Sequence, residues 1–242
     1  MRKNNMLTGS PIKTIVFFSL PIMLSSLLQY NYSLVDNIIV GRYVSTDALA
    51  AVGNVGPIGS FLIGAAFGLT SGFTIPVAHA FGAGDKRKLS HYAGNSITIS
   101  AIVGVAIIIV AHLLTRPLLK AIGTPSEIID LSAAYMNILY FGVPFQMLSN
   151  NFTAISRAVG ESKKPLYFFM ISVIVNFVLD LLFVKNFKWG VEGAAWATLI
   201  ANAVAALLTG IYVIKYNKDV EIKKSDLKPN MATALEQIKL GI

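Results

Sequence analysis

The sequence predicts an all-α polytopic membrane protein in which six transmembrane helices form one bundle. Two observations support this fold class. Hydrophobic residues make up 55% of the 242 residues and charged residues only 13%, with a mean hydropathy of +0.65, whereas soluble domains carry about 25% charged residues. The charges are also gathered in short segments between six apolar runs, each about 20 residues or longer, which is the length that a helix needs to cross a bilayer.

Short polar connections separate the predicted spans. Segments such as GRYVSTDA, GAGDKRK and VGESKKP are rich in Gly, Pro or charge and mark the places where the chain leaves the bilayer. The predicted spans cover residues 14–40, 50–80, 90–114, 130–156, 165–185 and 192–215. Residues 1–13 are expected to form a cytoplasmic N-terminus, residues 216–234 a cytoplasmic linker, and residues 235–242 the start of a second bundle that is missing from this chain.

The distribution of basic residues predicts the orientation in the membrane. Fifteen of the 20 Lys and Arg residues lie in the terminal segments and in the connections after the second and fourth spans, and five lie on the opposite side. Because cytoplasmic loops carry the excess of Lys and Arg, we expect both termini in the cytoplasm and the protein in the inner (cytoplasmic) cell membrane. The net charge of +8 then reflects topology, and no nucleic-acid partner is expected. The chain has no cysteine, which excludes disulfides and thiolate metal sites.

The second span carries glycines at a helical spacing. Gly64, Gly68 and Gly72 recur every four residues and would form one face of a helix. Such a face lets two helix backbones approach closely. We expect static packing against another helix, and a sliding surface for a moving helix is the alternative.

Two carboxylates inside the apolar runs are the best candidates for function. Asp36 lies in the first span and Asp180 in the fifth, where Asn176 shares its helix face one turn earlier. Thr198 lies in the sixth span. At about 1.5 Å per residue, Asp36, Asp180 and Thr198 all lie roughly 7–11 Å from the outer boundary, so they can meet. A charge within a membrane helix costs roughly 2.5–3.5 kcal/mol on insertion scales, and an oxygen-rich cluster suits Na⁺ or a shared proton.

Several other polar residues lie within or near the predicted spans. Isolated Asn and Thr residues usually bridge helices, so Asn176 and Thr198 taken alone favour that role. A polar cavity for a substrate can be lined by side chains of the first and fourth spans, namely Gln29, Tyr32, Tyr135, Gln146, Met147 and Asn150. His79, His91 and His112 show no ligand spacing, and no transition-metal site is expected.

The ordered motifs resemble one family, the multidrug and toxic compound extrusion (MATE) transporters. The resemblance covers the whole chain as that family's first half, and its most specific segment is SRAVGESKKP at residues 156–165. The other segments that carry it are SLP at residues 19–21, Val35-Asp36, TDALAAVG at residues 46–53, FGAGD at residues 81–85, Asn176 to Asp180, and GVEGAAWAT at residues 190–198.

The resemblance implies one bundle (the N-lobe) of a fold of six plus six helices, and export of organic, cationic drugs or toxic compounds. It implies a secondary active transporter, not an enzyme, that works as an antiporter by alternating access. Na⁺ or H⁺ is the coupling ion, no cofactor is expected, and the partners are the lipid bilayer, a drug or organic cation, and the second half. The implied cation ligands are Asp36, Asn176, Asp180, Thr198 and the backbone carbonyl of Ala194, and Pro21 is implied in bending of the first helix.

Three other functions are the alternatives to drug export. A lipid or lipid-linked oligosaccharide flippase of a related fold is the main alternative, but its cavity should be more cationic, and Arg157 lies only at a span boundary. A membrane-embedded enzyme would need acids or histidines at catalytic spacing. A bundle without transport is the third. The chain is expected to be an N-terminal fragment, because its tail resembles the run that leads into the first span.

Overall fold

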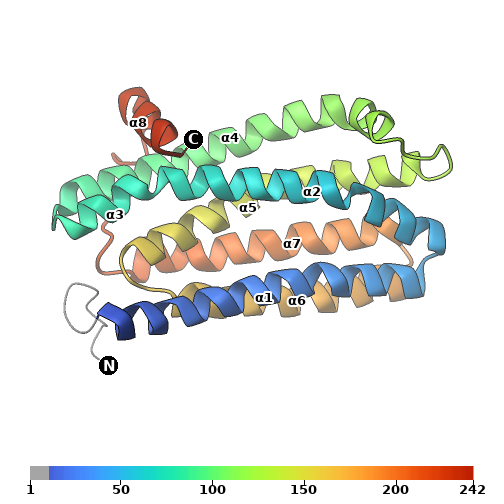
Figure 1. Ribbon diagram of the computed structural model, residues 1–242, viewed down its shortest axis with the longest axis horizontal. Helices are drawn as coiled ribbons and strands as arrows, with labels where there is room; N and C mark the ends of the chain where they lie inside the picture. The colour runs from blue at the N-terminus through green and yellow to red at the C-terminus, as the bar shows by residue number, and fades with distance from the viewer. Residues whose placement is uncertain (1–10, 242) are drawn as a thin grey trace.

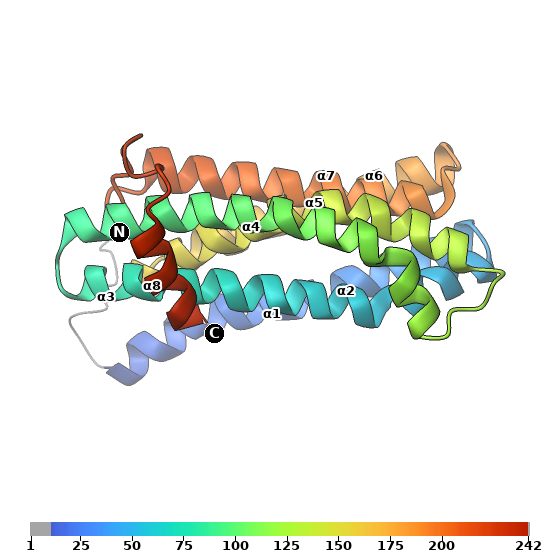
Figure 2. The same cartoon turned by 90° about the horizontal axis from the view of Figure 1, so that it is seen from above.

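A computed structural model of the chain describes residues 11–241 and contains no β-strand within them. The backbone forms long helices that run roughly alongside one another, and one short helix that crosses them near one end (Figures 1 and 2). The helices are α1 (Pro11–Tyr43), α2 (Thr46–Phe73), α3 (Ile75–Gly82), α4 (Lys86–Ala121), α5 (Ile129–Ala158), α6 (Lys163–Asp180), α7 (Gly190–Ile211) and α8 (Met231–Gly241), and two π-helical segments, η1 (Leu181–Asn186) and η2 (Tyr212–Tyr216), extend α6 and α7.

The helix α5 lies at the centre of the bundle. It packs against α2, α4 and α7, while α1 packs mainly against α6. Five helical segments are long and apolar enough to cross a membrane: Ile15–Tyr43, Thr46–Gly82, Lys86–Ala121, Lys163–Asn186 and Gly190–Tyr216. At 30 residues α5 is long enough, but it is not among them. A central helix contacts other helices more than lipid, so it tolerates polar residues. The structure therefore supports an all-helical membrane bundle, with five such segments where the sequence predicts six.

The predicted span over residues 50–80 is divided in two. α2 ends at Phe73, and α3 begins at Ile75 with Pro76 in its first turn. Proline lacks the N–H that a continuous helix would donate to the carbonyl four residues earlier. The Thr74 N–H instead bonds back to Ser71 and Gly72. The sequence prediction missed this break because both parts are apolar.

The glycines of α2 do not pack as expected. A Cβ added at Gly64 or Gly68 would meet nothing within 4 Å, and the same holds for Gly53, Gly56 and Gly59. Within the described residues, no other helix therefore packs closely at Gly64 or Gly68, whereas Gly72 is buried. Close approaches occur at other glycines. A Cβ on Gly104 of α4 would lie 2.7 Å from the Cα of Pro144 on α5.

The chain beyond α7 folds back onto the bundle. α8 begins at Met231, four residues earlier than the helical start expected at residue 235, and crosses near α2 and α4 (Figure 2). Gln237 is fully buried and bonds to both helices: its Oε1 accepts from Asn95 Nδ2 at 2.8 Å, and its Nε2 donates to the Phe73 carbonyl at the end of α2 at 2.8 Å. This end of the bundle, formed by the connections at residues 83–85, 159–162 and 217–230, is called the basic end below.

Candidate functional site

Four predicted polar residues from three helices meet inside the bundle. Asp36 comes from α1, Asn176 and Asp180 from α6, and Thr198 from α7; these four residues are called the acidic cluster. Asp36 is 5% exposed, Asn176 2% and Asp180 0%, and Thr198 is half-buried. The 3.6-residue repeat of α6 puts Asn176 and Asp180 on one face. The structure thus brings together the residues that the sequence places at a common depth.

Hydrogen bonds connect the members of the acidic cluster. Thr198 Oγ1 donates to Asp36 Oδ2 at 3.3 Å. In the amide orientation that satisfies its neighbours, Asn176 Nδ2 donates to Asp36 Oδ1 at 3.0 Å and to Asp180 Oδ2 at 3.2 Å. Asn176 Oδ1 then accepts from the Tyr32 hydroxyl at 3.0 Å. Asp180 Oδ1 is buried and has no hydrogen-bond partner among the described residues.

The two carboxyl groups are neighbours, because the same Asn176 Nδ2 lies 3.0 Å from Asp36 Oδ1 and 3.2 Å from Asp180 Oδ2. Two negative charges at such a distance repel, and a proton or a cation between them relieves the repulsion. Every group offered by the side chains of Asp36, Asp180 and Thr198 is an oxygen, and oxygen ligands are what hard cations prefer. The residues present therefore suit a small hard cation or a shared proton.

A π-helical turn begins directly after Asp180. The Phe187 N–H bonds to the Leu182 carbonyl five residues earlier, at 2.9 Å. Such turns inside α-helices often occur at functional sites. Ala194 is fully buried one turn before Thr198 on α7, and its role as a carbonyl ligand stays a prediction.

Pro21 lies inside α1 and is buried. It cannot donate an N–H to the carbonyl of Phe17, so α1 lacks one hydrogen bond there. Ser25 Oγ donates to the Pro21 carbonyl at 2.8 Å. Fifteen residues, or about 22 Å of helix, separate Pro21 from Asp36. Bending of α1 at this proline stays a prediction.

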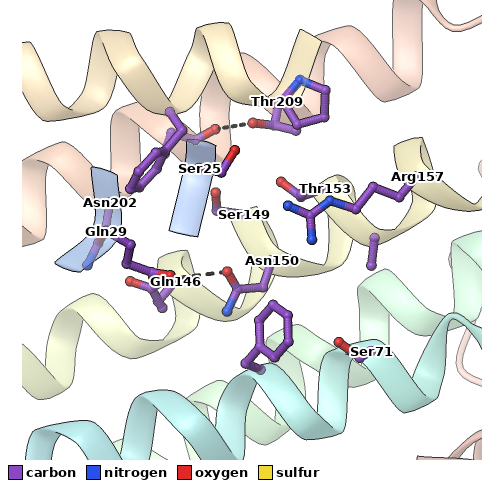
Figure 3. A pocket seen from close by; sticks show the side chains of 15 residues that line it. Ser25, Gln29, Ser71, Gln146, Ser149, Asn150, Thr153, Arg157, Asn202 and Thr209 are labelled. Carbon is purple, nitrogen blue, oxygen red and sulfur yellow. Dashed lines mark hydrogen bonds between the residues drawn. The ribbon is translucent and has the colours of Figure 1, made fainter. Parts of the chain in front are cut away.

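A pocket lies between α1, α2, α5, α6 and α7, in the half of the bundle nearer the basic end (Figure 3). Gln29, Gln146 and Asn150, all predicted for a substrate cavity, line it. Three other predicted residues do not. Tyr32 joins the acidic cluster through Asn176, while Tyr135 and Met147 are buried in the core, 7% and 0% exposed. Tyr135 shares the helix face of Gln146 but lies three turns further along α5, towards the acidic cluster. The role of Tyr32, Tyr135 and Met147 in a substrate cavity stays a prediction.

Several residues that line the pocket were not predicted. Ser149, Thr153 and Arg157 lie on α5 at steps of three or four from Gln146 and Asn150, so they share one helix face. This row of polar residues along one face of α5 could have been recognised in the sequence. Ser25 and Ser71, together with Asn202 and Thr209, supply the opposite walls.

Comparison with known proteins identifies the family. The family model MatE matches residues 21–182, which is well over half of the chain and includes both aspartates. The chain belongs to this family.

Relatives and solved structures agree with this assignment. The chain is 31% identical over 237 residues to "Probable multidrug resistance protein YoeA" of Bacillus subtilis, covering 95% of the chain and 51% of the relative. It is 28% identical over 236 residues to "Multidrug export protein MepA" of Staphylococcus aureus, covering 96% of the chain and 52% of the relative. These MATE relatives are transporters, so the chain is a multi-pass membrane protein of a transporter family.

The fold matches solved MATE structures along its full length. A crystal structure of MATE in the bent conformation has a TM-score of 0.91 and 29% identity, and the match covers 100% of this chain and 54% of that one. An outward-facing multidrug resistance MATE transporter of the MOP superfamily gives a TM-score of 0.90 at 29% identity, with 100% and 53% coverage. The chain thus spans about half the length of the relatives it matches, consistent with an N-terminal half.

Proposed function

We propose that this chain forms one bundle of a cation-coupled antiporter that exports organic drugs or toxic compounds, organic cations among them. The observation that carries the proposal is the acidic cluster, in which Asp180 Oδ1 is buried without a partner among the described residues. A buried carboxylate oxygen left unpaired is costly. A site that holds such an oxygen is suited to accept an ion.

The coupling ion under this proposal is Na⁺ or H⁺, bound at Asp36 and Asp180. Its charge would offset the repulsion between the two carboxylates. Tyr32, Asn176 and Thr198 would hold both side chains in place through the hydrogen bonds described above. An ion drives transport only if it binds the outward-facing and inward-facing states unequally. Pro21 gives α1 a weak point at which two such states can differ.

Transport under this proposal requires a second bundle facing this one. The proposal is supported by the relatives, which are about twice as long as the matched region. The basic end would face the cytoplasm, with both termini on that side of the inner membrane, because it holds most of the Lys and Arg residues. One matched relative is named a multidrug resistance protein and another a multidrug export protein, which supports drug export over lipid flipping.

Binding of radiolabelled Na⁺ to the purified chain in lipid nanodiscs tests the ion site. We expect saturable binding that Asp36→Asn and Asp180→Asn each abolish, while both variants stay folded. If H⁺ is the coupling ion, infrared difference spectroscopy should instead detect protonation of the two carboxyl groups. Asp130→Asn is the matched control, because Asp130 is an exposed acid at the far end of α5, paired with Arg116 at 2.8 Å. The proposal would be refuted if these two residues showed no Na⁺ binding and no change in carboxyl protonation.

Drug export tests the second part of the proposal. Proteoliposomes loaded with a fluorescent organic cation should release it when an inward Na⁺ or H⁺ gradient is applied, if the protein contains the partner bundle. Asp36→Asn should stop release without lowering the amount of protein in the membrane. Undiminished release by that variant would show that Asp36 does not couple ion and drug movement.

A further inference from the structure

At the end of the bundle opposite the basic end, the α1–α2 connection and the α6–α7 connection lie together (Figure 1). A Cβ added at Gly190, where α7 begins, would lie 3.8 Å from Cγ1 of Val44, just beyond the end of α1. The segment η1 also packs against α1. Side chains of the two connections form one surface, called the aromatic corner below, which consists of Arg42, Tyr43, Phe183, Lys185, Phe187 and Trp189.

Three aromatic rings form the first half of the aromatic corner. The rings of Phe183 and Trp189 are stacked, with centroids 4.8 Å apart, and the Phe187 ring lies 5.6 Å from that of Trp189. Phe187 is 53% exposed and Trp189 50%. Exposed aromatic surface of this size is unfavourable in water. It is favourable at the boundary between hydrocarbon and water, where Trp and Tyr rings gather at the level of the lipid headgroups.

The backbone of the α6–α7 connection holds these rings in a fixed arrangement. The Trp189 N–H donates to the Phe183 carbonyl at 2.9 Å, which closes the turn. Lys188, between Phe187 and Trp189, has a φ of 57°, in the left-handed region that residues other than glycine rarely adopt. Such strain persists only where the surrounding structure holds it. The exposed rings therefore belong to a defined turn.

Two basic side chains meet at one ring in the second half of the aromatic corner. Arg42 Cζ lies 5.9 Å from the centroid of the Tyr43 ring, and Lys185 Nζ lies 5.4 Å from the same centroid. Both distances are within the range of a cation–π interaction. The two charges, one from α1 and one from η1, are thus no further apart than the sum of these distances. Lys188 adds a third exposed cation beside them.

No acid within residues 11–241 forms an ion pair with these cations. Asp47 and Glu192 lie at the same end of the bundle, in the first turns of α2 and α7, but neither pairs with a cation of the aromatic corner. Arg116, also at this end, is paired with Asp130 at 2.8 Å. Of the five Lys and Arg residues that the sequence places on this side, three lie in or beside the aromatic corner. Their positive charge suits an anion.

We propose that the aromatic corner binds the phosphate of a membrane phospholipid and prefers an anionic headgroup such as that of phosphatidylglycerol. Arg42 and Lys185 donate to the phosphate oxygens through charge-assisted hydrogen bonds, and the rings of Tyr43 and Trp189 lie at the level of the headgroup. A lipid fits better than a soluble phosphate, because the exposed rings beside the cations need the apolar surroundings that a bilayer supplies. The proposal depends neither on the ion site nor on drug export.

Trp189 provides a way to detect the lipid at the aromatic corner. The chain contains two tryptophans, so Trp196→Phe leaves Trp189 as the only indole. The purified variant is placed in nanodiscs of phosphatidylcholine and phosphatidylglycerol in equal amounts, and one of the two lipids carries a nitroxide on its acyl chain close to the headgroup. We expect labelled phosphatidylglycerol to quench Trp189 fluorescence more strongly than labelled phosphatidylcholine. Equal quenching by the two lipids, or no quenching by either, would overturn the proposal.

Removal of the basic side chains tests the cause of this preference. In the Trp196→Phe background, Arg42→Gln and Lys185→Gln should each lower the affinity for phosphatidylglycerol relative to phosphatidylcholine by about fivefold, as expected for one cation near an anionic surface. Lys120→Gln is the matched control, because Lys120 is an exposed lysine at the same end of the bundle, in the last turn of α4. Unchanged preference in both corner variants, or an equal loss in Lys120→Gln, would overturn the assignment.

Two further variants separate charge from folding and a local site from general enrichment of one lipid. Lys185→Arg keeps the charge and should keep the preference; a loss as large as that in Lys185→Gln would overturn the role of the charge. Trp189→Phe leaves Trp196 as the probe, which is 41% exposed on α7 and about 10 Å further along the chain. Trp196 should not distinguish the two lipids. The same preference at both tryptophans would show general enrichment of phosphatidylglycerol around the bundle and would contradict a site.

Two other occupants of the aromatic corner are outcomes of the same measurement. Glycerophosphoglycerol is a soluble phosphate ester with the same headgroup, and its addition should leave the preference for phosphatidylglycerol unchanged. Loss of the preference would assign the corner to soluble phosphates and overturn the choice of a lipid. The partner bundle is the second possible occupant. A preference that is present in this chain alone but absent from a protein that contains both bundles would assign the surface to that bundle and overturn the lipid site.

Discussion

Thr198 Oγ1 donates a hydrogen bond to Asp36 Oδ2 over 3.3 Å, and so joins α7 to α1 across 162 positions of the sequence. α1 makes its main contacts with α6 and few with α7. This bond therefore connects α1, which contains Pro21, to the more central helix α7 at the acidic cluster. A change at Asp36 therefore alters a direct contact between α1 and α7.

Replacement of Thr198 by valine removes this bond but keeps the side-chain shape. We expect Na⁺ affinity to fall by up to roughly tenfold, because a typical hydrogen bond contributes about 0.5–1.5 kcal/mol. Radiolabelled Na⁺ binding in nanodiscs measures the change. Thr70→Val is the control, since Thr70 is buried on α2 and its hydroxyl bonds to the Ala66 carbonyl of its own helix. Equal losses in both variants would point to general destabilisation.

The close approach of α4 and α5 at Gly104 predicts a packing defect. A Cβ there would lie 2.7 Å from Pro144 Cα, which is backbone and cannot easily move aside. Gly104→Ala should therefore destabilise the bundle by about 1–3 kcal/mol, as overpacking does. Unfolding in detergent, followed by circular dichroism, measures the loss. Gly59→Ala, with nothing within 4 Å, should be close to neutral, and a comparable loss there would contradict this reading.

Some features of the molecule could be read from the sequence and others could not. Asp36 and Asp180 stood out because charges are rare in apolar runs, and the constant rise of a helix placed them at one depth. The pocket around Arg157 depends on how five helices lie side by side, which periodicity does not report. Arg157 itself resembled an ordinary residue at a span boundary, because its sequence neighbourhood does not show that its Nε is buried.

Gln237 is a second residue whose place in the fold could not be predicted from the sequence. From the sequence, residues 216–234 are predicted to form a linker and residues 235–242 the start of a second bundle, since no long apolar run marks a core. Yet the Gln237 side chain is fully buried, because its amide is matched by a donor on Asn95 and by two acceptors, the carbonyls of Phe73 and Tyr92. Such pairing depends on tertiary structure, so hydropathy alone could not find it.

The buried amide of Gln237 predicts how α8 is held. Gln237→Leu leaves Asn95 Nδ2 and the carbonyls of Phe73 and Tyr92 without their partner, and each such loss costs about 1–3 kcal/mol. We expect α8 to detach and the segment 217–230 to be cleaved faster by protease at native conditions. Met231→Leu is the control, because Met231 is 77% exposed on the same helix. Equal cleavage rates for wild type and Gln237→Leu would show that α8 is held by other contacts.

Pro21 supplies the last prediction, because it is the one feature of α1 that can separate ion binding from transport. Pro21→Ala restores the N–H to the Phe17 carbonyl and removes the proline cost of about 3 kcal/mol in a helix interior, so it favours an unbent α1. Na⁺ binding at the acidic cluster should persist, since Asp36 lies about 22 Å away, while ion-driven dye release should fall. Spin labels on α1 and α6 would report the change in bending. Pro117→Ala, at another proline inside a helix, should leave release unchanged; equal effects of the two substitutions would remove the special role of Pro21.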